Sequence, residues 1–259
     1  MKLIKLFFLV FGAIQISNSQ NDSSKKGIKR ILYTETNRQL LDNGEHYNYI
    51  TETNETLYDK KGLKQKSVRI IYNNSLPKNK KETTYHYNEK DQIIFSSSFI
   101  DKDSTQIKTN YVYHDDLLIK IHFNYIKNET EFKFEETYNY NIENKLVSSN
   151  YIYYEKYIDS DFDDYITFLI LKEKYDKKER TIEMDWTGSN ERYKHNKFIY
   201  KWRKNKLLAN EKEFDKNNKL IRKKRFKYAL DNKENWIVKK EIENKIINKI
   251  TYREIDYYE

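Results

Sequence analysis

One short pattern recurs along most of this chain and constrains its fold more than any other feature. Two aromatic residues one position apart are followed by Asn or Asp, a few polar residues and then a pair of aliphatic residues. Copies begin at Tyr85, Tyr111, Tyr138, Tyr200 and Phe226, and a related copy begins at Phe214. Tyr87, Tyr113 and Tyr140 are separated by 26 and 27 residues. A fixed period of this size indicates a repeat architecture in which each unit holds two strands and two turns.

Between these turns, polar and aromatic residues alternate with a period of two. Phe132, Phe134, Tyr138 and Tyr140 fall on one face of a strand, and the residues between them, among them Glu135, fall on the other. Aromatic and β-branched side chains suit such a half-buried, pleated surface. The pattern predicts an all-β protein with about sixteen antiparallel strands between Ile28 and Tyr252 and almost no helix.

The turns themselves contain few glycines, because the 259-residue chain has only five. Short hairpin loops usually need one residue at positive φ, which Gly adopts without strain and Asn adopts best among the other residues. Gly44 and Gly62 fit this place, and Asn144, Asn205 and Asn218 stand at the equivalent position in turns without glycine. We therefore expect many hairpins despite the low glycine content.

Two segments carry a resemblance to a known family. Residues 58–63, Tyr-Asp-Lys-Lys-Gly-Leu, and residues 214–220, which have Asn218 in place of Gly, resemble the YD repeat of Rhs-type proteins and the shorter hairpin arrays of exported bacterial proteins. The resemblance implies an antiparallel hairpin-repeat array, a long twisted or curled sheet with a period of about 26–27 residues. The large Rhs proteins wrap a shell around a toxin, a role for which this chain is too short.

The N-terminus predicts export. Lys2 and Lys5 precede an apolar stretch over 6–16 and the small residues at 17–19, so we expect a signal peptide over 1–19, cleaved before Gln20. A buried N-terminal helix is the alternative. A polar linker over 20–27 and a single β-repeat domain over 28–259 follow. Since no Cys follows the apolar stretch and no later segment is apolar enough to span a bilayer as a helix, we expect a secreted or periplasmic protein without a lipid anchor.

The residues that usually carry catalysis or bind cofactors are scarce. The chain has no Cys and no Gly-rich phosphate loop, nucleophile elbow or His-Glu-x-x-His motif, so the sequence predicts no cofactor and no catalytic residue. Two carboxylates brought together by the fold could still serve a glycosidase. A hydrolase of envelope or environmental glycans is therefore the alternative function.

Two short metal-binding patterns each have a simpler explanation. Asp159, Asp161 and Asp163 alternate like the first ligands of a calcium loop, although Asp164 stands where that loop needs Gly. A solvated acidic loop is the alternative. A two-histidine site would need the strands of His86 and His114 to lie together, and zinc would need a third ligand.

Charge is distributed in two blocks. Residues 129–165 have a net charge of −7 and residues 194–228 one of +11, while the whole chain carries +9, or +7 without Lys2 and Lys5. Arg222, Lys223, Lys224 and Arg225 form the densest basic segment, and alternation divides them between the two faces of a strand. A basic block is typical of a solvated face or of a surface that attracts an anionic envelope glycan, and nucleic acid is the least favoured partner.

These observations favour an exported, non-catalytic binding or structural module of the envelope or the extracellular space. Trp202 and Trp236 are candidate sugar-stacking residues and Arg222, Lys223, Lys224 and Arg225 candidate anion-binding residues, the alternative being that both tryptophans pack against neighbouring strands. An exposed edge strand would invite a partner peptide strand or self-association. The oligomeric state stays open.

Overall fold

The computed structural model describes residues 27–40, 46–73, 76–100, 105–127, 130–157, 166–188, 196–203 and 205–258. Within these ranges the chain forms sixteen strands. They are β1 (Ile28–Leu40), β2 (His46–Tyr58), β3 (Lys64–Asn73), β4 (Leu76–Tyr87), β5 (Ile93–Ile100), β6 (Thr105–His114), β7 (Leu117–Lys127), β8 (Thr130–Tyr140), β9 (Leu146–Tyr157), β10 (Ile166–Tyr175), β11 (Thr181–Gly188), β12 (Asn196–Trp202), β13 (Leu208–Phe214), β14 (Leu220–Leu230), β15 (Trp236–Glu243) and β16 (Ile246–Tyr257). The described residues contain no helix long and apolar enough to cross a membrane.

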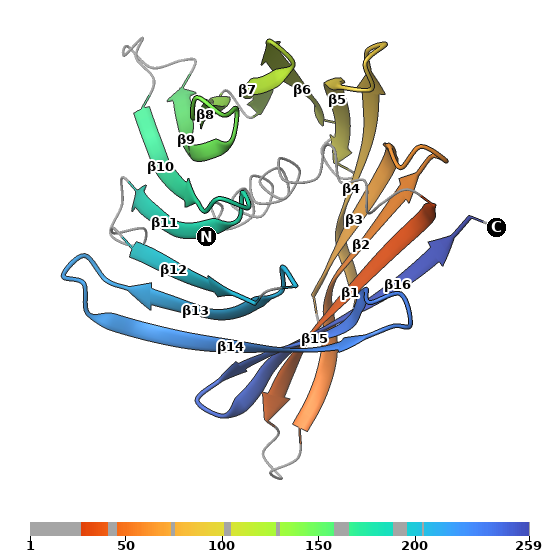
Figure 1. Cartoon of the computed structure of the whole chain (residues 1–259), viewed down its shortest axis with the longest axis vertical. Helices are drawn as coiled ribbons and strands as arrows, with labels where there is room; N and C mark the ends of the chain where they lie inside the picture. The colour runs from red at the N-terminus through yellow and green to blue at the C-terminus, as the bar shows by residue number, and fades with distance from the viewer. Residues whose placement is uncertain are drawn as a thin grey trace.

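Each strand pairs antiparallel with the next one along the chain, and β16 pairs back with β1 to close a barrel. Figure 1 shows β1 and β16 side by side, with Ile31 opposite Ile255 and Thr36 opposite Ile250 in the register. The prediction of an all-β fold of antiparallel hairpins is confirmed. The long twisted sheet implied by the resemblance is corrected, because the sheet closes on itself.

Closure also removes the edge strands on which one partner prediction rested. The backbone groups of β1 and β16, the two strands that would form the edges of an open array, pair with each other over most of their length. The expected docking of a peptide strand at a sheet edge is therefore wrong, since closure leaves no edge among the described strands.

One five-residue turn joins strands repeatedly, mostly at the same end of the barrel. Its first residue is usually Asp or Asn, whose side-chain oxygen accepts hydrogen bonds from the backbone N–H groups two and four positions later, as Asn141 does from Glu143 and Lys145. Its fourth residue has positive φ, and this position holds Gly62, Asp91, Asn144, Glu179, Lys206, Asn218 and Glu234. The turn chemistry explains how the chain makes hairpins with few glycines.

The turn predictions can be compared with these positions. Gly62, Asn144 and Asn218 have positive φ, as expected. Asn205 was the wrong residue, because that turn begins at Arg203 and its fourth position is therefore Lys206, with φ 62°. The predicted turn at Gly44 lies outside the described residues.

The aromatic residues that end each repeat bind the neighbouring strand. The Tyr87 hydroxyl donates to the Lys64 carbonyl at 2.7 Å and the Tyr140 hydroxyl to the Leu118 carbonyl at 2.8 Å. Trp202 Nε1 donates to the Thr181 carbonyl at 2.7 Å. In each case the acceptor lies at the start of the preceding strand. The 27-residue period thus reflects one aromatic side chain in every two strands that donates a hydrogen bond to a backbone carbonyl of the preceding strand.

Positive φ at a non-glycine residue makes a prediction about stability. Replacing the exposed Glu234 (φ 60°) with Gly should raise the free energy of unfolding by about 0.5–1 kcal/mol, because relief of strain outweighs the extra freedom of the unfolded chain. Asn232→Gly in the same turn should lower it by a similar amount, since Asn232 does not have positive φ. Urea unfolding measures both, and equal losses in the two variants would contradict the interpretation.

Candidate functional site

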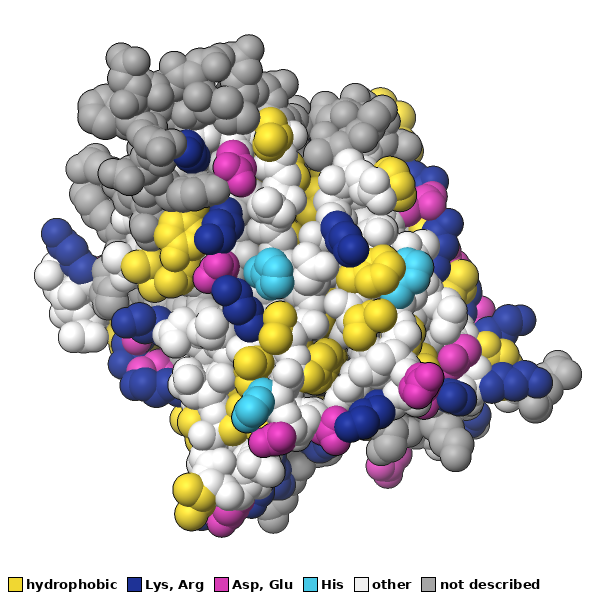
Figure 2. Space-filling model, turned by 90° about the horizontal axis from the view of Figure 1, so that it is seen from above, with side chains coloured by type: hydrophobic (Ala, Val, Ile, Leu, Met, Phe, Trp, Pro, Cys, Tyr) yellow, Lys and Arg dark blue, Asp and Glu magenta, His cyan; other side chains and the backbone are white. Residues whose placement is uncertain are grey.

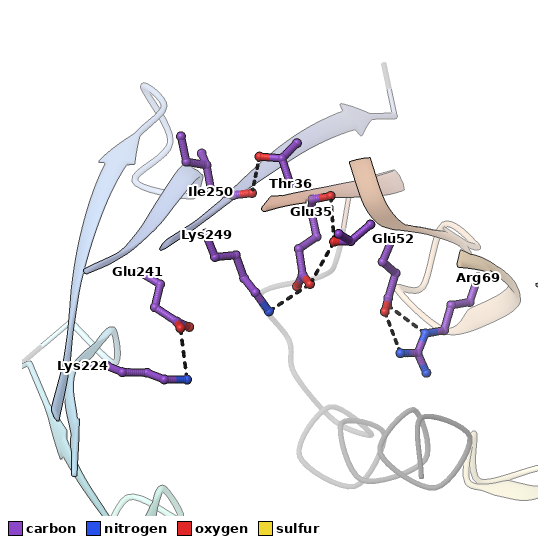
Figure 3. Close-up of polar contacts among 9 residues, drawn as sticks. Glu35, Thr36, Glu52, Arg69, Lys224, Glu241, Lys249 and Ile250 are labelled. Carbon is purple, nitrogen blue, oxygen red and sulfur yellow. Dashed lines mark hydrogen bonds and ion pairs between the residues drawn. The ribbon is translucent and has the colours of Figure 1, made fainter. Parts of the chain in front are cut away.

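Alternation and register assign every strand residue to one of two faces of the wall. Ile31 lies opposite both Thr56 and Ile255, and the same face continues around the ring through Ser67 and Thr83. Figure 3 shows Glu35, Glu52, Arg69, Lys224, Glu241 and Lys249 from this face pointing into the space that the strands surround. We call this face the inner wall and the opposite face the outer wall.

The outer wall is polar and its charges pair across strands. Lys66 Nζ lies 2.7 Å from a carboxylate oxygen of Glu82, and Glu135 accepts from both Lys120 at 3.1 Å and Lys133 at 3.2 Å. In the surface seen in Figure 2, basic, acidic and histidine side chains are interspersed with hydrophobic ones, and the coloured side chains form no continuous hydrophobic band. This wall is suited to contact with water.

The inner wall from β5 to β12 is largely aromatic and aliphatic, and we call it the aromatic zone. Its main cluster includes Phe123, Phe134, Tyr151, Leu171 and Phe198. Phe134 is 1% exposed and Leu171 is fully buried. Stacked rings such as Phe123 and Phe134, with centroids 4.9 Å apart, link neighbouring strands. This zone is a closed core that solvent does not reach.

The inner wall of β1–β4 and β13–β16 is instead rich in charged residues, and we call it the charged zone. Its charged members are Glu35, Glu52, Arg69, Lys81, Glu211, Glu213, Arg222, Lys224, Lys239, Glu241, Glu243, Lys249 and Arg253. Most pair across strands: Arg69 with Glu52 at 2.6 Å, Lys249 with Glu35 at 2.9 Å, Lys224 with Glu241 at 3.0 Å and with Glu211 at 3.3 Å, and Arg222 with Glu213 at 2.5 Å. Figure 3 shows most of these pairs.

Solvent reaches part of the charged zone. The side chains of Glu35 and Lys249 each keep 31% of their surface exposed although they point inward. By contrast, Glu136 in the aromatic zone is fully buried. The inner wall is therefore divided into a largely buried region and a region that solvent partly reaches.

Three cations of the charged zone, Lys81, Lys239 and Arg253, form no ion pair with any described residue. Burial, with a contribution from the charge of Arg69, lowers the pKa of Lys81 to about 8. Burial likewise lowers the pKa of Lys239. With these three groups the charged members of the zone are seven cations and six acids, a net charge of +1.

Two of these cations belong to a cluster with aromatic rings. The Arg253 guanidinium lies 5.2 Å from the Trp236 ring and 5.6 Å from the Tyr33 ring, and Lys239 Nζ lies 5.9 Å from Trp236. The rings of Tyr33 and Trp236 are 5.7 Å apart, and Tyr228 meets Trp236 edge-on at 6.2 Å. We call Tyr33, Tyr228, Trp236, Lys239 and Arg253 the tryptophan cluster.

Polar atoms beside this cluster lack a hydrogen-bond partner. Thr251 Oγ1, Arg253 Nε and Asn54 Oδ1 are buried, and none of them bonds to a described residue. Thr251 lies opposite Glu35 and Lys239, and Asn54 lies opposite Tyr33, so all three atoms border the cluster. Buried polar groups are normally satisfied, so these three atoms are open to a bound polar group, as are the unpartnered carboxyl oxygens of Glu136 in the aromatic zone.

A second cluster, of acids and tyrosines, lies within the aromatic zone. Glu136 faces Tyr151 across the strands, and Ser149 lies opposite both Tyr138 and Glu173. The Tyr175 hydroxyl donates to Glu173 at 2.6 Å. Burial raises the pKa of Glu136 to about 8, against the opposing effect of the Tyr138 and Tyr151 hydroxyls and with a small addition from Glu173. Burial also raises the pKa of Glu173.

This acid pair has the chemistry of a general acid but lacks the access. Glu136 is 0% exposed and Glu173 is 3% exposed, so neither carboxyl group can touch a polymeric substrate. Glycoside hydrolysis needs both carboxyl groups to flank the scissile bond. The cluster therefore does not support the hydrolase alternative.

The basic residues predicted to bind an anion do not form one surface. Arg222 and Lys224 point inward and have acid partners, whereas Lys223 and Arg225 are exposed on the outer wall. Trp202 and Trp236 also lie apart: Trp202 bonds the Thr181 carbonyl, while Trp236 belongs to the tryptophan cluster. Both walls of β14 therefore carry basic residues, and only the inner ones are neutralised.

The predicted metal ligands are not brought together. Asp159, Asp161 and Asp163 lie outside the described residues. His86 stacks on Phe95 at 4.0 Å on the outer wall, and His114 lies at a turn beside Asp115. In the described part of the chain, no group of three metal-ligating side chains occurs.

Sequence analysis identified Trp236 but missed Arg253, Lys239, Thr251 and Asn54. A signal was present in the alternation along residues 249–257, which places Thr251, Arg253 and Ile255 on one face of a strand. What the sequence lacked was the pairing of β16 with β1, which brings Arg253 opposite Tyr33.

The fold defines the chain as a closed antiparallel barrel, and a solved structure is similar to it over most of its length. A porin-like protein of Bacteroides uniformis is similar with a TM-score of 0.55 and 10% identity, over 88% of this chain and 98% of that one. A porin-like protein of Bacteroides vulgatus has a TM-score of 0.49 and 11% sequence identity, over 87% of this chain and 97% of that one. The TcdB2-TccC3-Cdc42 complex gives only 0.16 at 10% identity, covering 82% of this chain and 15% of that one.

These similarities establish a shared fold at most. The Bacteroides uniformis structure supports a closed barrel in place of the repeat array that the YD-like segments implied. No protein-family model matches the chain. No curated protein matches it in sequence.

The paired charges of the inner wall make a prediction about stability. Lys224→Met should lower the free energy of unfolding by about 2–3 kcal/mol, because it leaves Glu211 and Glu241 half-buried without their cation. Lys223→Met, on the outer wall of the same strand, should change it by less than about 0.5 kcal/mol. Equal effects in urea unfolding would contradict the assignment of the two faces.

The buried acid predicts a pH dependence. Because the pKa of Glu136 is raised above that of an unfolded glutamate, its stabilising effect is complete at acidic pH and is lost as the pH rises toward 8. The free energy of unfolding should therefore fall between pH 5 and pH 8, and Glu136→Gln should remove much of this fall. Glu135→Gln, at the neighbouring outer position, should leave it in place. If the free energy of unfolding of Glu136→Gln fell between pH 5 and pH 8 as much as that of the unchanged protein, the assignment of this fall to Glu136 would be contradicted.

Proposed function

We propose that this chain is an exported, non-catalytic barrel that remains in water and serves as a binding module of the cell envelope or the extracellular space. The observation that carries the proposal is the polarity of the two walls. A barrel that spans a membrane has an apolar band on its outside and a polar interior. Here the outer wall is charged, and half of the inner wall is an aromatic core.

The outer charges lie where a lipid-facing band would have to be. Residues near the middle of their strands on this wall include Glu82, Lys108, Glu135, Lys172, Asp185, Lys212, Arg225 and Lys240. Each Lys or Arg at the midplane of a bilayer costs about 2–4 kcal/mol, with smaller costs for the acids. Their combined cost would exceed the stability of an ordinary domain, so water is the compatible solvent.

The charged zone supplies the binding surface. The Glu35–Lys249 pair, with 31% of each side chain exposed, is in contact with solvent, and the unpaired cations and unsatisfied polar atoms lie near it. The enclosed acids Glu136 and Glu173 offer no competing catalytic site. A binding role therefore agrees with the described chemistry better than hydrolysis does. The predicted signal peptide over 1–19 would deliver the chain across the inner membrane.

Purification without detergent and flotation with lipid vesicles test this proposal. A chain beginning at Gln20 should purify as a dispersed protein without detergent and should not float with phosphatidylethanolamine and phosphatidylglycerol vesicles. Lys108, Lys172, Lys212 and Lys240 should react with a water-soluble amine reagent equally well with and without vesicles, while the inner Lys224 serves as a protected control. Flotation of the folded barrel, or vesicle protection of the four outer lysines, would overturn the proposal.

A further inference from the structure

We propose that the tryptophan cluster and its polar neighbours form a binding site for an acidic sugar, with its carboxylate held by Arg253 and Lys239 and its ring stacked on Trp236. The inference deepens the proposed binding function and rests on it. It requires cations without acid partners, polar atoms without partners, an aromatic surface and access for a solute. Each of these is present at one place on the inner wall.

The cations are suited to an anion because neither forms a direct ion pair with a described carboxylate; Glu35 and Glu241 act on Lys239, and Asp231 on Arg253, only from farther away. Other basic residues of the charged zone, such as Arg69, Lys224 and Lys249, have acid partners within 3.3 Å. Arg253 and Lys239 have none among the described residues and lie on the neighbouring strands β16 and β15. A carboxylate between them would supply the missing charge and accept charge-assisted hydrogen bonds.

The unsatisfied atoms match the remaining groups of a sugar. Arg253 and Thr251 are each 7% exposed, yet Arg253 Nε and Thr251 Oγ1 have no hydrogen-bond partner in the described chain. Asn54 Oδ1, also without a partner, can accept from a sugar hydroxyl, and Thr251 Oγ1 can both donate and accept. Anions without a hydroxyl group would use the donors but leave the Asn54 acceptor unsatisfied.

The aromatic rings supply the third element of sugar recognition. Trp236 lies between Tyr33 and Tyr228, at centroid distances of 5.7 and 6.2 Å, and it is not fully buried. A broad ring of this kind can cover the apolar face of a sugar and keep it dry. Arg253 and Lys239 lie over the same ring, 5.2 and 5.9 Å from its centroid, where they would hold the carboxylate while the sugar stacks on the part of the ring that they leave free.

Access comes from the neighbouring part of the wall. Thr251 lies opposite Glu35, and the Glu35–Lys249 pair is 31% exposed at both side chains. Figure 3 shows this pair pointing into the space inside the barrel. A solute that reaches Glu35 is therefore one residue pair away from Thr251, while the closed aromatic zone excludes it from the rest of the interior.

The test uses calorimetric titration of the barrel beginning at Gln20 with trigalacturonate, maltotriose and inorganic phosphate as probes. Trigalacturonate should bind saturably, maltotriose at least tenfold more weakly, and phosphate without saturation at the same concentrations. Arg253→Met and Trp236→Leu should each weaken trigalacturonate binding at least tenfold. Arg225→Met, which removes an exposed cation from the outer wall, should leave the affinity within about twofold. Lys239→Met, which removes an unpaired cation without leaving an acid unpaired, serves as the second charge variant if Arg253→Met does not fold.

The outcomes distinguish this inference from the function on which it rests. Equal affinity for maltotriose would overturn the requirement for an acidic group, and saturable phosphate binding would reduce the site to a simple anion site. Equal weakening by Arg225→Met would move the binding to the outer wall. Absence of trigalacturonate binding by a barrel that is dispersed without detergent would overturn the inference alone, whereas a barrel that enters vesicles would overturn the proposed function.

Discussion

The pairing of β1 with β16 is the interaction on which the rest of the structure depends. It joins residues more than two hundred positions apart, such as Ile31 and Ile255, and converts a row of hairpins into a ring. In a ring, one face of each strand lies on the outside of the barrel and the other faces the enclosed space. The same pairing covers the backbone groups that the first and last strands would otherwise expose, which removes the main route to edge-to-edge aggregation.

Closing sixteen strands creates a filling problem that smaller barrels do not have. About eight strands make an interior that side chains can fill, whereas sixteen make one that holds water in porins. This chain fills the interior of its barrel in two ways. Large aromatic residues close the inner wall from β5 to β12, and charged residues that tolerate water line the remainder. The division gives the barrel a buried core on one side and a partly solvent-exposed inner surface on the other.

Local features of the fold could be predicted from the sequence, and the reasons are physical. Alternation along residues 131–140 fixes which side chains share a face, and the turn at Asn141 needs only its own side chain and the positive φ of Asn144. Closure has no local signature, because the residues of β1 and β16 that meet are ordinary alternating strand residues. For that reason Trp236 could be named as a binding candidate, but its approach to Tyr33 and Arg253 could not.

The charged zone shows why total charge was a poor guide to binding. The basic block over residues 194–228 looked like an anion-binding surface, yet its inward members Arg222 and Lys224 are neutralised by Glu213, Glu211 and Glu241 from adjacent strands. The cations left unpaired on the inner wall are Lys81, Lys239 and Arg253, and the last two belong to strands whose sequences are not notably basic. What distinguishes a cation that can bind a ligand is the absence of a partner opposite it in the register, and that property exists only once the barrel has closed.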